Sequence, residues 1–126
     1  MAEEKKGAAL DAMAKAGLFR SFLDSQNAKE IEVIDIKNRG SIADAMLVAT
    51  ATSRRHAHGL ADGIHRICGQ EGIELLGMEG YEGADWILID CNDTLVNIFQ
   101  EEARDLYKLE DLWSGKLRQK KEDKRQ

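Results

Sequence analysis

Three potential metal ligands, His58, Asp62 and His65, recur at helical spacing in this sequence. Residues three and four positions apart lie on one side of a helix, so imidazole and carboxylate groups placed in this way could bind zinc. At 3.6 residues per turn, however, this stripe lies about 100° from the centre of the apolar face of the same helix, where water reaches it. The sequence has no Cys-x-x-Cys and no His-Glu-x-x-His spacing to strengthen the case. We therefore predict no metal site and no cofactor.

Two cysteines, Cys68 and Cys91, are the candidates for thiol chemistry. Both occur in apolar stretches, and Cys91 lies beside Asp90 and Asp93, whose negative charges disfavour a thiolate. Free buried thiols fit a reducing compartment, and two cysteines do not make a disulfide framework. We predict that both cysteines are structural and unreactive.

The strongest enzymatic interpretation is nucleotide transfer, because Gly40-Ser41 follows a predicted strand. That chemistry needs two carboxylates at alternate positions of the next strand, so that both reach the same pair of metal ions. The next strand, residues 45–50, contains no carboxylate, and Asp35, Asp44 and Asp90 are isolated in the sequence. Phosphate-binding loops and hydrolase elbows are also missing. We therefore predict that the chain is not an enzyme.

The elements that must position these residues alternate between helix and strand. Helices are predicted for residues 8–26, 53–69 and 101–107, and strands for 31–36, 45–50, 74–79, 86–90 and 94–99. The apolar face of the first helix is predicted to consist of Leu10, Met13, Ala14, Leu18 and Phe22. Residues 45–50 are apolar on both faces, which is typical of a central strand. The order αββαβββα predicts an α/β (α+β) domain with a single mixed sheet of about five strands and flanking helices.

Length and charge limit the kinds of partner that the chain can have. Its 126 residues fit a single domain, and its net charge is −5. Residues 116–126 hold six basic and two acidic side chains, so residues 1–115 are more acidic than the whole chain. An acidic domain repels phosphate backbones and favours a basic protein surface, whereas the basic tail, predicted to be disordered, could contact RNA.

With no apolar run near the roughly 20 residues of a membrane span and no secretory signal in residues 1–7, we expect a cytoplasmic protein without membrane contact.

Six segments of the sequence, taken together, resemble one family. They are residues 41–44 (SIAD), 49–56 (ATATSRRH), 79–81 (EGY), 85–90 (DWILID), 92–93 (ND) and 101–113 (EEARDLYKLEDLW). Their order and spacing are similar to those of the ribosomal silencing factors, also called the Iojap family, over residues 8–114. The chain departs from the family pattern at Ala51, which replaces a common glycine, at Arg54, which replaces a serine, and at Asn97, which replaces a histidine.

The resemblance implies a nucleotidyltransferase-like fold without catalytic carboxylates. It also implies a translation repressor that docks on ribosomal protein L-fourteen of the large ribosomal subunit. Docking there would block association with the small subunit, especially under nutrient limitation. Two other interpretations remain open, namely an acidic adaptor for another basic protein and a nucleotide-binding relative of the nucleotidyltransferases. An exposed sheet edge or apolar face could also support a homodimer.

Strand 86–90 is the predicted docking surface, because the resemblance places the family's interface on it. Trp86, Leu88 and Asp90 should point to one face of the sheet, and Ile87 and Ile89 to the other. A tryptophan among apolar neighbours can anchor an interface, although it can equally pack under a helix. The predicted partner-binding residues are Trp86, Ile87, Leu88, Ile89, Asp90, Glu79 and Tyr81.

Particular roles follow for some of these residues. Glu79 and Asp90 could pair with basic side chains of the partner, and Tyr81 could either contact the partner or plug its own loop. Asp44, Arg55 and His56 match family positions near the start of the central helix and are candidates for a secondary interface. Alternatively, Arg55 or His56 could hydrogen-bond to Asp44 and hold the start of the helix to the preceding turn.

Overall fold

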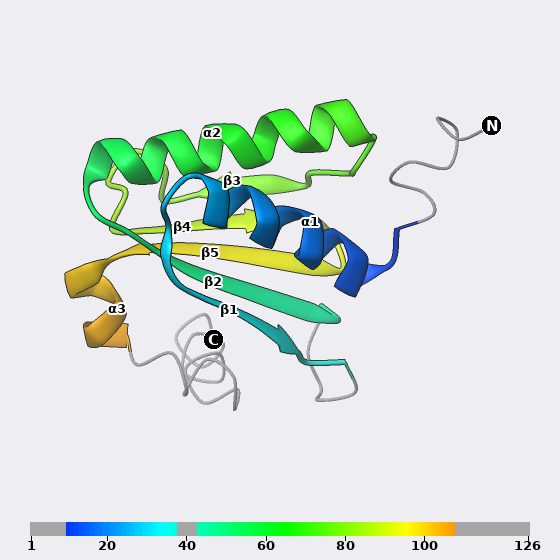
Figure 1. The fold of residues 1–126 in the computed structure, drawn as a ribbon, viewed down its shortest axis with the longest axis horizontal. Coiled ribbons are helices and arrows are strands. Elements are labelled where there is room, and N and C mark those ends of the chain that lie inside the picture. The colour runs from blue at the N-terminus through cyan, green and yellow to red at the C-terminus, as the bar shows by residue number, and fades with distance from the viewer. Residues whose placement is uncertain (1–9, 38–42, 108–126) are drawn as a thin grey trace, which may run out of the picture.

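The computed structural model describes residues 10–37 and 43–107 of the chain. These residues form three helices and five strands (Figure 1): α1 Ala12–Ser25, β1 Lys29–Asp35, β2 Ala45–Ala51, α2 Arg54–Glu71, β3 Gly77–Glu79, β4 Trp86–Asp90, β5 Thr94–Gln100 and α3 Glu101–Tyr107. The predicted order αββαβββα is therefore confirmed. Gly40-Ser41 and the basic tail lie outside the described residues.

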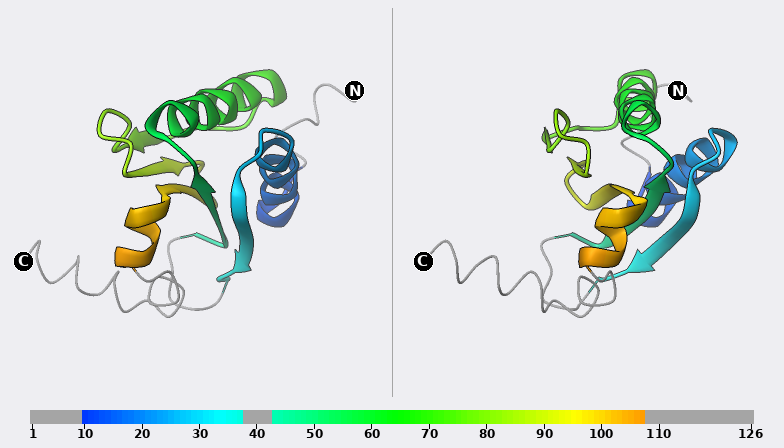
Figure 2. Two further views of the ribbon diagram at one scale, coloured as in Figure 1. Left: turned by 60° about the vertical axis from the view of Figure 1, so that its left-hand side comes forward. Right: turned by 90° about the vertical axis from the view of Figure 1, so that its left-hand side faces the viewer.

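The five strands form one mixed sheet in the order β1-β2-β5-β4-β3. The central strands β2 and β5 run parallel, and the other neighbouring pairs are antiparallel. Helices α1 and α2 cover one face of the sheet, and the short α3 lies on the opposite side (Figure 2). The prediction of a single mixed sheet with flanking helices is confirmed.

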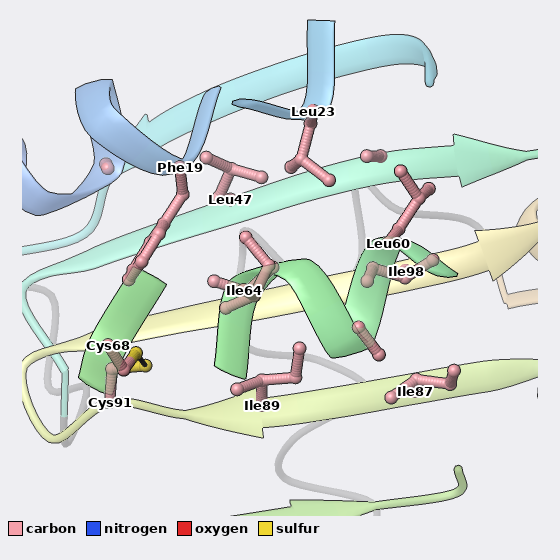
Figure 3. Close-up of a cluster of buried hydrophobic side chains, with 14 of the residues drawn as sticks. Phe19, Leu23, Leu47, Leu60, Ile64, Cys68, Ile87, Ile89, Cys91 and Ile98 are labelled. Atoms are coloured by element: carbon pink, nitrogen blue, oxygen red, sulfur yellow. Dashed lines mark hydrogen bonds between the residues drawn. The ribbon is translucent and has the colours of Figure 1, made fainter. Parts of the chain in front are cut away.

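The main hydrophobic core lies between the sheet and the two longer helices (Figure 3). Its largest members include Phe19 and Leu23 of α1, Leu60 and Ile64 of α2, and Ile98 of β5. Every residue of β2 is buried, as its apolar sequence predicted for a strand inside the sheet. The structure thus accounts for a core without metal or disulfide links.

The apolar face predicted for α1 was right only in part: Leu10, Leu18 and Phe22 are half-buried and pack against the main core, but Met13 and Ala14 are exposed. The buried residues of α1 are Ala12, Lys15, Ala16, Phe19 and Leu23, whereas Met13 is 46% exposed. Four of these five buried residues are apolar and recur at helical spacing, so the centre of the buried face lies to one side of the predicted one. The Lys15 Nζ lies 3.0 Å from Asp93 Oδ1, and this ion pair allows a lysine to occupy a buried position.

The ends of α2 follow from local chemistry. The Ser53 side chain accepts a hydrogen bond from the backbone N–H of His56 at 3.0 Å, which caps the helix N-terminus. Gly72 ends the helix in the left-handed conformation with φ 70°, which glycine adopts without steric cost. The next strand is shorter than predicted, because Ile73 N–H still bonds to Cys68 O and so belongs to the helix ending. No helix among residues 10–37 and 43–107 is both long and apolar enough to cross a membrane.

Candidate functional site

The outer face of the sheet, which we define as the face away from α1 and α2, carries the predicted docking residues of β4. In β4 the burial alternates: Trp86, Leu88 and Asp90 are partly exposed, and Ile87 and Ile89 are fully buried. The register aligns Glu79 of β3 with Leu88 and Asn97, and residues directly opposite each other share a face. The outer face therefore brings together Glu79, Trp86, Leu88 and Asp90.

Trp86 is held in a defined orientation on this face. Its indole Nε1 donates a hydrogen bond to Asn97 Oδ1 at 2.9 Å. Its ring stacks on Phe99 with the ring centroids 5.0 Å apart. Asn97 is 2% exposed and also donates to Leu47 O at 3.4 Å, so the acceptor is itself fixed. Because its partners fix the ring, Trp86 would lose little rotamer freedom on binding a partner.

Ile87 and Ile89 do not reach the outer face. Both have no exposed surface and belong to the main core, where α2 packs against β4 (Figure 3). The prediction that all five residues of this strand contact a partner therefore narrows to Trp86, Leu88 and Asp90. The two isoleucines instead pack into the core on the opposite face of the strand, so listing them as partner-binding residues was wrong.

Two carboxylates border the apolar part of the outer face. Glu79 is exposed at the end of β3, the strand at this edge of the sheet. Asp90 closes β4, and its Oδ1 accepts a hydrogen bond from the Asn92 backbone N–H at 2.9 Å. This bond organises the tight turn to β5, where Asn92 has a positive φ of 71°. Negative charge is thus positioned next to Leu88 on the outer face, from both β3 and β4.

Tyr81 lies on the helix side of the sheet and closes its own loop. Its ring stacks on His58 with centroids 4.3 Å apart, and its hydroxyl donates to Asp62 Oδ1 at 2.9 Å. The Tyr81 carbonyl accepts from His58 Nε2 at 2.6 Å. The hydrogen bond to Asp62 raises the pKa of Tyr81, and the negative charge of Asp62 adds to the shift. These contacts favour the loop-plug interpretation of Tyr81 and engage His58 and Asp62, two of the three side chains that were considered as metal ligands.

Arg54 adds a further contact to the same loop. Its Nη2 donates to the Glu82 carbonyl at 2.7 Å. Arg54 is one of the positions where the sequence departs from the family pattern, and the structure gives the arginine a specific role. Gly80 begins the loop with φ 80°, and a Cβ there would collide with the Trp86 carbonyl. The loop after β3 is therefore tied to both α2 and β4.

The proposed internal bond from Arg55 or His56 to Asp44 is wrong. Asp44 precedes β2 and His56 follows it, so the two lie at opposite ends of a seven-residue strand, about 20 Å apart at 3.3 Å per residue. His56 Nε2 donates to Gln26 O at 2.8 Å, and its Nδ1 accepts from Thr52 N at 3.0 Å. Asp44 N bonds to Asp93 O at 2.8 Å. Asp44, Arg55 and His56 thus do not form one surface, although Arg55 is exposed.

Arg104 of α3 is a buried cation that the sequence did not reveal. Its guanidinium bonds to Glu32 Oε2 at 2.8 Å, to Thr50 Oγ1 at 2.6 Å and to the Glu30 carbonyl. Glu30 has a positive φ of 49° where the register of β1 shifts. Arg104 therefore fixes α3 to the irregular part of β1. The neighbouring Ala103 packs in the same cluster as Phe99 of β5. No short-range pattern indicates this contact, since the partners are more than 50 residues away.

The described residues hold no arrangement typical of a catalytic metal site. No group of three or more histidine, cysteine, aspartate or glutamate side chains within residues 10–37 and 43–107 is placed to hold a metal ion. Strand β2 contains no carboxylate.

A family model, related sequences and a solved structure all match most of this chain. The family model described as "Ribosomal silencing factor during starvation" matches residues 9–126. A ribosomal silencing factor of Haemophilus influenzae is 36% identical over 102 residues, which cover 81% of this chain and all of that protein. One from Halalkalibacterium halodurans is 33% identical over 91 residues, covering 72% of this chain and 78% of its own. A crystal structure of a Chromobacterium violaceum protein matches with a TM-score of 0.78 at 29% identity, over 82% of this chain and 87% of that one.

Proposed function

The chain belongs to the family of ribosomal silencing factors, and from this premise we propose that it silences translation by docking on the large ribosomal subunit through ribosomal protein L-fourteen. The outer face of the sheet, centred on Trp86, makes the contact. Bound there, the domain occupies the surface that the small subunit must approach, and the two subunits cannot join. The chain acts by occupying space, without a chemical step.

The observation that carries this proposal is the fixed, partly exposed Trp86. An interface anchor needs large apolar area and little freedom to lose on binding. The hydrogen bond to Asn97 and the stack on Phe99 restrict the indole, and Leu88 extends the apolar area beside it. Ile87 and Ile89 fix the strand from the core side. Together these contacts make β4 a rigid support for a hydrophobic contact.

Charge supports a basic partner for the same face. Proteins that bind ribosomal RNA present cationic side chains to phosphates, so the surfaces of ribosomal proteins are commonly basic. Glu79 and Asp90 place carboxylates around the apolar centre, where they can attract and orient such a surface. Rim charges of this kind mainly raise the association rate, so docking should weaken as salt increases. The basic residues 116–126 extend the contact to ribosomal RNA in this proposal.

Sedimentation of the purified protein with isolated subunits tests the proposed surface. Trp86→Ala should reduce the affinity for the large subunit at least about 30-fold, which corresponds to the roughly 2 kcal/mol of an interface hot spot. Met13→Ala is the matched control, because Met13 is an exposed apolar side chain on α1, on the other side of the sheet. Far-ultraviolet circular dichroism checks that both variants fold. Equal binding of a folded Trp86→Ala variant and the control would place the docking surface elsewhere.

A further inference from the structure

A pair of thiols lies at one end of the main core, remote in sequence but adjacent in space. Cys68 belongs to the last turns of α2, and Cys91 directly follows β4. Their sulfur atoms are 3.7 Å apart although the residues are 23 positions apart in the chain. Figure 3 shows the two sulfurs side by side between the end of α2 and the end of β4. Both side chains are buried.

The surroundings favour loss of one proton from this pair. Accepting a hydrogen bond from Cys91 lowers the pKa of Cys68, against the opposing effect of burial. The shared proton and burial raise the pKa of Cys91. The ammonium group of Lys15, itself buried in its ion pair with Asp93, lowers the pKa of both thiols. A thiolate at Cys68 therefore has a hydrogen-bond donor and a nearby cation.

The geometry is close to that of a disulfide. A disulfide joins its sulfurs at about 2.05 Å, so these two atoms must approach by less than 2 Å. Cys68 lies near the end of α2, where helices fray, and Gly69 and Gly72 flank it. Opening of this last turn would admit a small oxidant without separating the strands.

We propose that Cys68 and Cys91 form a reversible intrachain disulfide when the protein meets a peroxide. The Cys68 thiol first releases its proton; the thiolate then attacks one peroxide oxygen, the O–O bond breaks, and the departing hydroxide takes up that proton, so that a sulfenic acid and water form. The Cys91 sulfur then attacks the Cys68 sulfur, and the hydroxyl group leaves with the Cys91 proton as a second water. Two thiols lose two electrons to one peroxide, and a dithiol reductant reverses the reaction.

The link ties the C-terminal end of α2 to the turn that begins after Asp90. Closing a loop of this length restricts the unfolded chain, so oxidation should stabilise the fold. We expect the melting temperature of the oxidised protein to be about 5–10 °C higher than that of the reduced protein. This inference is independent of the ribosomal partner.

Mass spectrometry provides the test, because trypsin leaves both cysteines in one peptide. No lysine or arginine occurs between Arg66 and Arg104, so residues 67–104 are released together. The purified full chain is treated with hydrogen peroxide, denatured, alkylated and digested. A peptide lighter by two hydrogen masses, carrying no alkyl group, is expected; dithiothreitol before alkylation should restore two alkyl groups.

Three results would overturn the inference. They are full alkylation of both cysteines after peroxide, a peptide dimer that shows pairing between two copies, and oxygen added to one sulfur without a disulfide. Cys68→Ala is the matched control, and it should lose both the mass change and the gain in melting temperature. The peptide measurement on the unaltered chain decides the question even if that variant does not fold.

Discussion

The hydrogen bond between Trp86 and Asn97 can be measured with a double-mutant cycle. Trp86→Phe keeps an aromatic ring over Phe99 but removes the N–H donor, and Asn97→Leu removes the acceptor while keeping the same number of side-chain heavy atoms. Trp86→Phe leaves a buried amide oxygen without this donor, at a cost of about 1–3 kcal/mol. In Asn97→Leu water can reach the partly exposed indole, but the Leu47 carbonyl loses the Asn97 donor, so we expect a cost of similar size.

The coupling between the two substitutions isolates the hydrogen bond itself. We expect about 0.5–1.5 kcal/mol from urea unfolding followed by circular dichroism, since Trp86→Phe removes a fluorophore. Asn97→Leu should also weaken binding to the large subunit about 2–10-fold, because an unrestrained indole loses more rotamer freedom on docking. Additive effects, with a coupling below about 0.3 kcal/mol, would refute the view that Asn97 orients Trp86.

Two further predictions concern the contacts that hold α3 and the loop after β3. Arg104→Ala should lower the free energy of unfolding by about 2–4 kcal/mol, because it leaves the Thr50 hydroxyl and the Glu30 carbonyl without their donor. Glu32→Gln should lower the free energy of unfolding by less than about 1 kcal/mol, because Glu32 is 43% exposed. Equal losses for Arg104→Ala and Glu32→Gln in urea unfolding would contradict this expected difference. The bond to Asp62 raises the pKa of Tyr81 in the folded state, so its stabilisation should be complete below about pH 10 and be lost as pH rises further. Tyr81→Phe should remove this part of the alkaline loss in pH-dependent unfolding, and an unchanged profile would refute the assignment.

Much of the fold was predictable because its signals are local. The alternation of Trp86–Asp90 predicted which side chains share a face, and the apolar β2 predicted a central strand. The helix predicted for residues 53–69 is observed as Arg54–Glu71, since helix ends depend on a few neighbouring residues such as Ser53 and Gly72. The family resemblance then indicated which strand to consider for docking.

Long-range polar contacts were not predictable from such signals. The burial of Lys15 on α1 is accompanied by an ion pair with Asp93, which lies 78 residues away. Arg104 is likewise buried by partners on β1 and β2. Asn97 was noted only as a departure from the family pattern, although it is the acceptor that orients Trp86. In each case the side chain's role depends on which strands become neighbours.

The most direct test of the central claim is subunit joining in sucrose gradients. Isolated small and large ribosomal subunits are mixed with the full chain at increasing concentration, and joined ribosomes are quantified. The proposal predicts that joined ribosomes decrease as the protein appears with the large subunit alone, and that added free ribosomal protein L-fourteen restores joining by competition. Undiminished joining at saturating binding, or protein bound to joined ribosomes, would contradict the claim that docking excludes the small subunit.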